Sequence, residues 1–516
     1  MKKIFGIFIA TFAVTTIQAQ DINDAMRFAQ DNQTGTARFS AMSGAFGALG
    51  GDFSAISVNP AGSSVFANNQ VGATLGVFSS KNNSNYFGTN SSENNSKFDL
   101  SQAGGVYVFE DKGNDWSKFA LALNYENTKN LDNSIYSAGT NPTNSLANYF
   151  LSYANGVPLE LVQTQSGESI QSLYNYLGSL PNFDYPNIHG YGAQQAMLGY
   201  QSYMINSTDE DIPGNTAYTS NVPVANYYQE NLIESSGYIG KLSFNGSAVY
   251  KDKLMIGINL NSHFTDYRQS STFYEENDYN NTTTTDLVKR VRFNNDLYTY
   301  GNGFSFQLGT IFKATKEFRI GLAYESPTWY RMNDELSQSI ASVRGNVDGE
   351  LPADVVDPQL TMVYESYRLQ TPGKVTGSLA YVFGKKGLIS LDYARKDYSN
   401  TKFQPKSDFT ATNNLMSNVL TATNEFRIGA EYKIEKFSLR GGYRFEESPY
   451  KNGKTIGDLT GYSTGIGYNF GEFKIDLAYA FSQRDTQQRF FSQGLTDAAS
   501  IKSKNNNINV TVLFEL

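Results

Sequence analysis

The sequence of 516 residues contains no cysteine and only two histidines and two tryptophans. Without cysteine there can be no disulfide framework and no thiolate metal centre. Two histidines offer few nitrogen ligands for a transition metal, so the composition predicts neither a metal site nor a bound cofactor. The net charge of −8 is scattered along the chain, and the absence of a basic patch argues against nucleic acid as a partner.

Aliphatic density is also low, because hydrophobic residues make up only 40% of the chain while it carries 35 Tyr and 35 Phe. Such a composition does not suit a large aliphatic core. It is typical of a β-protein whose aromatic rings lie at a membrane interface.

The first residues have the pattern of a secretory signal peptide. Met1 to Lys3 form a positive start, residues 4–17 are apolar, and Ile17-Gln18-Ala19 is an acceptable cleavage site, so we expect a signal peptide at 1–19. The apolar run is shorter than the roughly 20 residues of a spanning helix. If the mature chain spans a membrane, it must do so as a barrel.

From residue 70 onward apolar residues recur with a period of two. In one example Phe473, Ile475 and Leu477 alternate with polar or small residues, which predicts strands with one face toward hydrocarbon and the other toward water. About fourteen such segments predict an all-β, antiparallel outer-membrane barrel over 70–516. Short turns alternate with long loops, so both termini should be periplasmic in a Gram-negative cell.

The predicted outer loops include residues 80–97, 272–299 and a very long segment, 130–233. The long segment contains apolar clusters at helical spacing in 146–151, 159–162 and 170–180, and we expect helices there.

The segment before the barrel, residues 20–69, has a different character. Residues 21–28 predict a short amphipathic helix. Phe39, Met42, Phe46 and Leu49 follow at helical spacing among small residues, so we expect a second helix that Gly50 and Gly51 end. Asp52 then starts a short helix through Ile56, which Pro60 ends.

This amino-terminal segment, with Asn59-Pro60-Ala61 following Gly50-Gly51-Asp52, resembles the hatch of the FadL/TodX family of outer-membrane transport proteins for long-chain fatty acids and other hydrophobic compounds. The resemblance implies a helical plug inside the lumen, at 20–69, with Asn59, Pro60, Ala61, Gly50 and Gly51 as gating residues. It further implies passive passage of a fatty acid or similar hydrophobic molecule, captured by the outer loops.

Several charged residues share the inward parity of the strands. They are Arg319, Arg427, Arg440, Arg444, Lys474, Asp392, Glu431 and Asp476. These groups either neutralise one another and fill the barrel, or leave one arginine free to bind a carboxylate. We select Arg440, Arg444 and Arg427, with the hatch residue Phe46, as candidate ligand contacts.

No catalytic signature is present, so we expect no enzyme. The best catalytic pair would be His263 with Asp266 on one strand, and a histidine at that place is typical of an ordinary polar wall residue. The expected partners are a fatty acid-like molecule and outer-membrane lipid, and the expected state is a monomer. Two other functions stay open, a partner in outer-membrane protein export and a haem-binding receptor.

Overall fold

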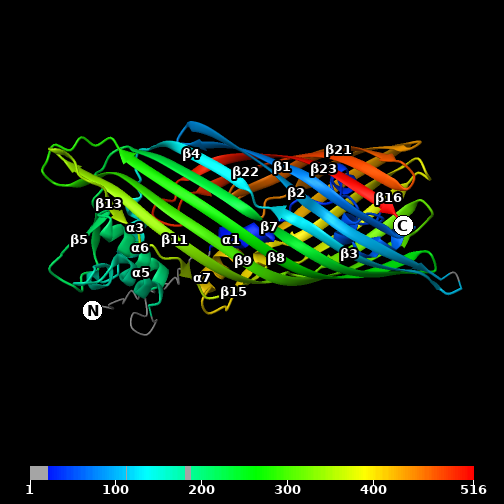
Figure 1. Cartoon of the computed structure of the whole chain (residues 1–516), viewed down its shortest axis with the longest axis horizontal. Helices are drawn as coiled ribbons and strands as arrows, with labels where there is room; N and C mark the ends of the chain where they lie inside the picture. The colour runs from blue at the N-terminus through cyan, green and yellow to red at the C-terminus, as the bar shows by residue number, and fades with distance from the viewer. Residues whose placement is uncertain (1–20, 112, 181–187) are drawn as a thin grey trace, which may run out of the picture.

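The computed structural model describes residues 21–111, 113–180 and 188–516. The predicted signal peptide therefore lies outside the described residues. The chain forms one closed, elongated antiparallel barrel of fourteen strands, with helices inside it and at one end (Figure 1). The predicted fold class is confirmed.

Several of the fourteen barrel strands are interrupted or flanked by short strand segments, and β5 and β6 form a separate two-stranded sheet. The strands are β1 (Gln70–Tyr86), β2 (Thr89–Glu110), β3 (Trp116–Asn130), β4 (Asn133–Asn141), β5 (Ile205–Ser207), β6 (Tyr218–Ser220), β7 (Tyr227–Tyr250), β8 (Leu254–Asn277), β9 (Leu287–Lys313), β10 (Phe318–Glu325), β11 (Trp329–Asn346), β12 (Gly349–Glu350), β13 (Asp354–Val356), β14 (Met362–Val363), β15 (Tyr367–Gln370), β16 (Lys374–Val382), β17 (Gly387–Asp397), β18 (Lys402–Gln404), β19 (Ala422–Ile434), β20 (Phe437–Glu446), β21 (Ile456–Asn469), β22 (Phe473–Arg489) and β23 (Ala498–Glu515). Pairing of β1 with β23, from Gln70 opposite Glu515, closes the barrel.

The α-helices are α1 (Ile22–Ala29), α2 (Ala37–Ala41), α3 (Ala147–Ala154), α4 (Leu159–Val162), α5 (Ile170–Gly178), α6 (Gly190–Gln201) and α7 (Thr410–Val419). Short 3₁₀ helices are η1 (Ser54–Ser57), η2 (Pro60–Val65) and η3 (Tyr398–Asn400). In the described residues, no helix has both the length and the apolar character that crossing a membrane requires.

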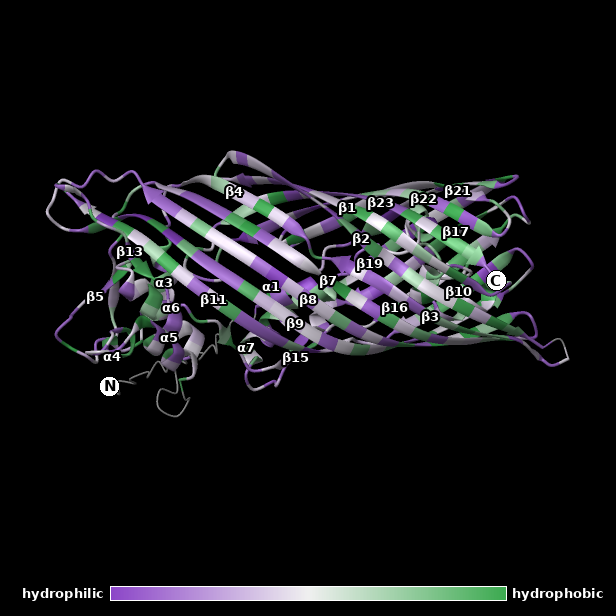
Figure 2. Ribbon diagram, viewed as in Figure 1, coloured by the Kyte–Doolittle hydropathy of each residue, from purple (hydrophilic) through white to green (hydrophobic). Residues whose placement is uncertain are grey.

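An apolar belt surrounds the barrel near the end that carries the carboxyl terminus. Each barrel strand exposes at least one large apolar side chain there: Leu75, Tyr107, Leu121, Phe244, Ile258, Leu308, Leu322, Leu379, Leu391, Ile428, Leu439, Ile466, Leu477 and Val510. Hydrophobic residues are prominent in this half of the molecule, and polar residues increase toward the other end (Figure 2). The alternation predicted from the sequence therefore has the expected sense, apolar outward and polar inward.

Two predicted outer loops are wrong, because their residues continue the strands, and the predicted loop 130–233 is too long, because β4 and the first residues of β7 pair within it. Of residues 80–97, only Phe87 and Gly88 form the turn between β1 and β2. Strand β8 likewise runs to Asn277 and β9 starts at Leu287. The ends of β1 and β2 are rich in Asn and Ser and have no apolar face from which a strand could be predicted. The outer ends of β8 and β9 contribute Phe273, Val291 and Phe293 to an apolar core outside the apolar belt.

The long segment after β3 folds into a cap, which we define as residues 142–226. Helices α3, α4 and α5 confirm the three predicted helical clusters, and α6 is an additional helix. The cap shares an apolar core with the ends of the barrel strands, including Phe150 of α3 and Phe293 of β9. Glu275, at the outer end of β8, accepts hydrogen bonds from Leu146 N at 2.8 Å and Gln229 Nε2 at 2.7 Å. Burial raises the pKa of the Glu275 carboxyl to about 7.

The hatch, residues 21–69, lies inside the barrel. The predicted first helix is confirmed as α1, with Asp21 as its N-cap. The predicted second helix is too long, because α2 ends at Ala41 and the chain then turns through Ser43 and Gly44, both with positive φ. Pro60 starts η2 rather than only ending the helix before it.

The path of the hatch qualifies the prediction of two periplasmic termini. Strands β1 and β23 do begin and end at the same end of the barrel. Helix α1, however, lies deeper in the lumen and contacts α7 and Tyr330 of β11, so the described chain starts inside the barrel and not beside the carboxyl terminus (Figure 1).

Candidate functional site

The hatch rests on the barrel wall at two pairs of glycines. Gly257 of β8 and Gly309 of β9 are opposite each other in the ladder. A Cβ added to Gly309 would lie 2.0 Å from Asn59 Oδ1, and one added to Gly257 would lie 2.5 Å from the Pro60 backbone. Only glycine permits the Asn59-Pro60 backbone to approach the wall this closely.

The second pair is Gly429 of β19 and Gly442 of β20, which are also opposite each other. Added Cβ atoms would lie 2.6 Å and 2.5 Å from the backbone of Met42. The hatch therefore has two paired seats, one under Pro60 and one under Met42, and a single glycine of β10, Gly321, makes a further close contact with the Gly47 backbone.

Asn59 connects the first seat to the rest of the hatch. Its Nδ2 donates to Gly47 O at 2.6 Å and to Thr310 O of β9 at 2.9 Å. Its Oδ1 accepts from Ala61 N at 3.1 Å and so caps η2. The side chain is fully buried, and both of its N–H groups and its oxygen form hydrogen bonds that fix this corner.

Asp392 of β17 holds the middle of the hatch. Its carboxylate accepts hydrogen bonds from Phe46 N at 2.9 Å and from Gly47 N at 3.0 Å. Phe46 itself is fully buried against Phe39, with ring centroids 5.5 Å apart. Phe46 therefore lies in the packing of the hatch, next to the wall contact of its own backbone.

A buried chain of charges links the hatch to the lumen wall. Arg38 Nε of α2 lies 2.9 Å from Glu431 Oε2, and the same oxygen is 2.7 Å from Arg440 Nε. Arg440 Nη1 is 2.6 Å from Asp476 Oδ1. Two carboxylates thus neutralise Arg440, which is the arrangement expected of charges that fill the barrel.

Arg444 and Arg427 lie in a second charged group, on the other side of the hatch from Glu431. Arg427 pairs with Glu425. Arg444 lies 3.7 Å from Glu446 and is fully buried, and its Nε has no hydrogen-bond partner within the described residues. Of the arginines singled out from the sequence as ligand contacts, Arg444 has the most unused hydrogen-bonding capacity.

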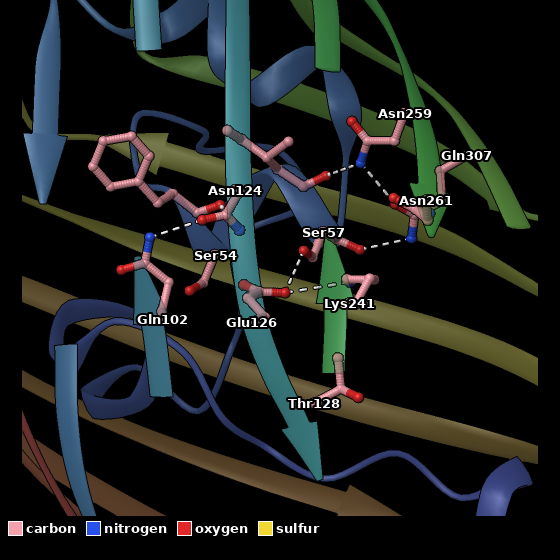
Figure 3. Close-up of polar contacts among 12 residues, drawn as sticks. Ser54, Ser57, Gln102, Asn124, Glu126, Thr128, Lys241, Asn259, Asn261 and Gln307 are labelled. Carbon is pink, nitrogen blue, oxygen red and sulfur yellow. Dashed lines mark hydrogen bonds and ion pairs between the residues drawn. The ribbon is translucent and has the colours of Figure 1, made fainter. Parts of the chain in front are cut away.

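Polar side chains from β2, β3, β7, β8 and β9 surround η1 (Figure 3). Ser57 Oγ donates to Glu126 Oε2 at 2.5 Å, and Lys241 Nζ lies 3.3 Å from the same oxygen. Asn259 Nδ2 donates to Ile56 O at 2.9 Å, and Gln307 Nε2 donates to Ser57 O at 2.8 Å. These contacts use side chains of the wall, so η1 is held without any strand pairing.

The wall beside this cluster is not closed by backbone hydrogen bonds. The ladder between β2 and β3 ends at Gln102 opposite Glu126, whereas β2 continues to Thr89 and pairs there only with β1. Beyond the last pair, Asn127 Nδ2 donates to Asp99 Oδ2 at 2.6 Å. We call residues 97–101 and 127–132 the seam, because side chains alone join the two strands there.

Helix α1 is the part of the hatch nearest the cap, and it packs among aromatic side chains of the wall. We call this cluster the aromatic chamber. Met26 and Phe28 contact a cluster that includes Tyr330, Tyr367 and Phe403. Arg27 lies over the ring of Tyr267, 4.0 Å from its centroid. An eight-residue helix is marginal alone, so its order depends on this apolar packing.

The two histidines lie in different parts of the molecule. His263 faces the lumen, as its parity predicts, and its Nε2 is 2.8 Å from Ser305 Oγ. His189 is the N-cap residue of α6 in the cap. In the part of the chain that the structure describes, no group of three or more His, Cys, Asp or Glu residues could hold a metal ion.

The sequence reasoning missed the seam, the two glycine seats and the Glu126-Lys241 pair. The seats could have been predicted from the sequence, since its inward-facing positions include four glycines: Gly257, Gly309, Gly429 and Gly442. The seam has none, because which residues of β2 and β3 pair cannot be derived from either strand alone.

Comparison with known proteins gives one family. Residues 219–512 match the model of the outer membrane protein transport protein family (OMPP1/FadL/TodX). The fold is similar to that of a Pseudomonas aeruginosa FadL homologue, with 12% identity, a TM-score of 0.51, and coverage of 94% of this chain and 99% of that one. The Pseudomonas putida toluene transporter TodX has 13% identity, a TM-score of 0.49, and coverage of 95% and 100%. No curated protein sequence matches the chain.

Proposed function

The chain belongs to the outer membrane protein transport protein family (OMPP1/FadL/TodX), and from this we propose that it passes long-chain fatty acids or other hydrophobic small molecules inward by passive diffusion, gated by the hatch. The family is one of transport proteins and not of enzymes, and it acts in the outer membrane of Gram-negative bacteria on hydrophobic compounds. The barrel closes within one chain, so a monomer suffices.

In this proposal the cap captures the molecule from outside. Tyr176, Tyr203 and Ile212 are exposed on the cap, with 45%, 42% and 53% of their surface accessible. Exposed apolar side chains beyond the membrane provide a first surface for a hydrophobic molecule. The aromatic chamber around α1 is the next apolar environment inward.

The position of the hatch beside the seam is the observation that carries the proposal. Ser57 of the hatch contacts Glu126, the last residue of β3 that pairs with β2, and beyond it no ladder joins these two strands. Phe98 and Leu100 of the seam face outward, toward hydrocarbon. A shift of η1 would therefore connect the lumen to the membrane, and we infer a sideways exit at the seam.

Cross-linking the seam tests this exit. The natural chain has no cysteine, so the variant D99C/N127C can be joined specifically by a short bifunctional thiosulfonate. Cells carrying this variant should lose uptake of radiolabelled hexadecanoate on cross-linking and regain it after reduction. The control Y107C/L121C joins two outward residues that are already paired in the ladder, and its uptake should be unaffected.

Full uptake through a cross-linked seam would reject the sideways exit. If cells that carry the unmodified protein took up no more hexadecanoate than cells without it, the transport proposal itself would be rejected. In that case export and haem binding would be the functions to test next.

A further inference from the structure

A cavity of about 620 Å³ lies at the end of the barrel that carries the carboxyl terminus. It is bounded by η2 of the hatch, by Asn114 and Asp115 before β3, by Lys251 and Asp252 after β7, and by Lys313 and Arg319 at the facing ends of β9 and β10. The volume is within the range of small-molecule sites. Its lining is mostly charged and polar, and the proposed function does not use it.

Two cations face this cavity without carboxylate partners. Lys313 of β9 and Arg319 of β10 are opposite each other in the ladder, and both have inward parity. Like charges in such a position repel each other. Two acids of the cavity pair with other lysines of its lining, since Glu110 lies 3.4 Å from Lys118 and Asp115 lies 3.6 Å from Lys251. Asp252 accepts a hydrogen bond from Ser117. Within the described residues, neither Lys313 nor Arg319 forms an ion pair.

Arg319 also retains hydrogen-bonding capacity. Its Nη1 donates to Leu49 O at 3.0 Å, immediately before the Gly50-Gly51 corner of the hatch. Its Nε is buried and has no partner among the described residues. A guanidinium with an unused N–H group can bind an anion while it keeps its hydrogen bond to the hatch.

The cavity also has an apolar side. Val65 of η2, Val249 of β7 and Met255 of β8 line it, and they belong to one apolar cluster with Ala61 and Ile311. Cations and an apolar surface therefore border the same space. This combination fits a molecule with an anionic end and an apolar body.

We propose that this cavity is a binding site for the anionic head group of an amphiphile, with Lys313 and Arg319 holding a carboxylate and Val65, Val249 and Met255 contacting its first methylene groups. The proposal rests on the proposed function only for the chemical class of the amphiphile, and the site is separate from the sideways exit at the seam. It adds a site at the inner end of the barrel, in contact with the hatch corner through Arg319.

A local fluorescence titration tests the site. Asn114 lines the cavity, so an environment-sensitive fluorophore on N114C, in a chain without other cysteines, reports binding there. The full-length protein in nanodiscs of zwitterionic lipid is titrated with octanoate, methyl octanoate and inorganic phosphate. Octanoate should bind, and K313Q/R319Q should weaken it roughly 10- to 100-fold.

Two further variants keep the result interpretable. K253Q/K316Q removes the same charge from exposed turns at the same end, and should leave the octanoate affinity unchanged. K313R/R319K keeps both cations and should bind octanoate within about threefold of the natural chain. Heat-dependent gel mobility establishes that each variant is a folded barrel.

Equal octanoate affinity in K313Q/R319Q and the natural chain would overturn the proposal. If the natural chain bound methyl octanoate as tightly as octanoate, the proposed role of the carboxylate would be wrong. If it bound inorganic phosphate as tightly as octanoate, the ligand would be a free inorganic anion and not an amphiphile. The titration needs no transport, so a failure of hexadecanoate uptake with intact octanoate binding would reject the proposed function and not this site.

Discussion

Replacing Asn59 with alanine should release the hatch at its first seat and leave the barrel folded. The substitution removes three hydrogen bonds, to Gly47 O, Thr310 O and Ala61 N. A buried hydrogen bond contributes about 1 kcal/mol net, and the carbonyls left behind lose their partners. The loss should be about 3 kcal/mol for the hatch corner, which is about a hundredfold change in its opening equilibrium. The fourteen strands keep all of their ladder bonds, so global unfolding should change little.

Hydrogen exchange measured by mass spectrometry is the assay, with the protein in nanodiscs. Amides of residues 54–66 should exchange about a hundredfold faster in Asn59→Ala, while amides of β8 and β9 should not change. Asn68→Ala is the matched control, because Asn68 is exposed and bonds only to Glu515 at the rim. Unchanged exchange in the hatch would refute the assignment of Asn59 as the residue that fixes this corner.

Three further predictions concern buried charges. Glu431→Gln removes the shared partner of Arg38 and Arg440 and should lower the free energy of unfolding in guanidinium chloride by about 3 to 5 kcal/mol; a loss below about 1 kcal/mol would contradict the burial argument. Arg444→Gln should weaken binding of hexadecanoate more than of its methyl ester, because only the acid loses a charge-assisted contact, and equal losses in a binding titration would indicate general damage to the lumen. Because the pKa of Glu275 is raised to about 7 when the cap is folded, its contribution to cap stability is complete below pH 4.5 and is lost as the pH rises through about 7, a change of about 3 kcal/mol. Exchange of the α3 amides should follow this pH dependence, and Glu275→Gln should abolish it.

Features that depend on local pattern were predictable from the sequence. The strands of the apolar belt alternate with a period of two, so β22 and β23 were found with their correct outward faces. The helices α3 to α5 were found because their apolar residues recur at helical spacing. In each case one face of the helix or strand contacts an apolar environment, so apolar residues recur in the sequence with the period of that element.

Features that depend on distant pairing were not predictable. The outer ends of β1 and β2 carry Asn and Ser on both faces, so no alternation marks them, and the outer ends of β8 and β9 pack against the cap, which comes from another part of the chain. The end of α2 at Ala41 depends on Ser43 and Gly44, which turn because Met42 must reach its seat on Gly429 and Gly442. The sequence also could not decide whether Arg440 is neutralised or free to bind a carboxylate, because its partner Asp476 comes from another strand.

The two glycine seats have a consequence for biogenesis. One seat is built by β8 and β9, in the middle of the chain, and the other by β19 and β20, near its end. The hatch is synthesised before either of them. Its packing surface is therefore incomplete until β20 has joined the sheet, so a segment that is synthesised before the barrel strands is among the last to acquire its native contacts. Whatever inserts this barrel must keep residues 21–69 on the inner side while β1 is joined to β23.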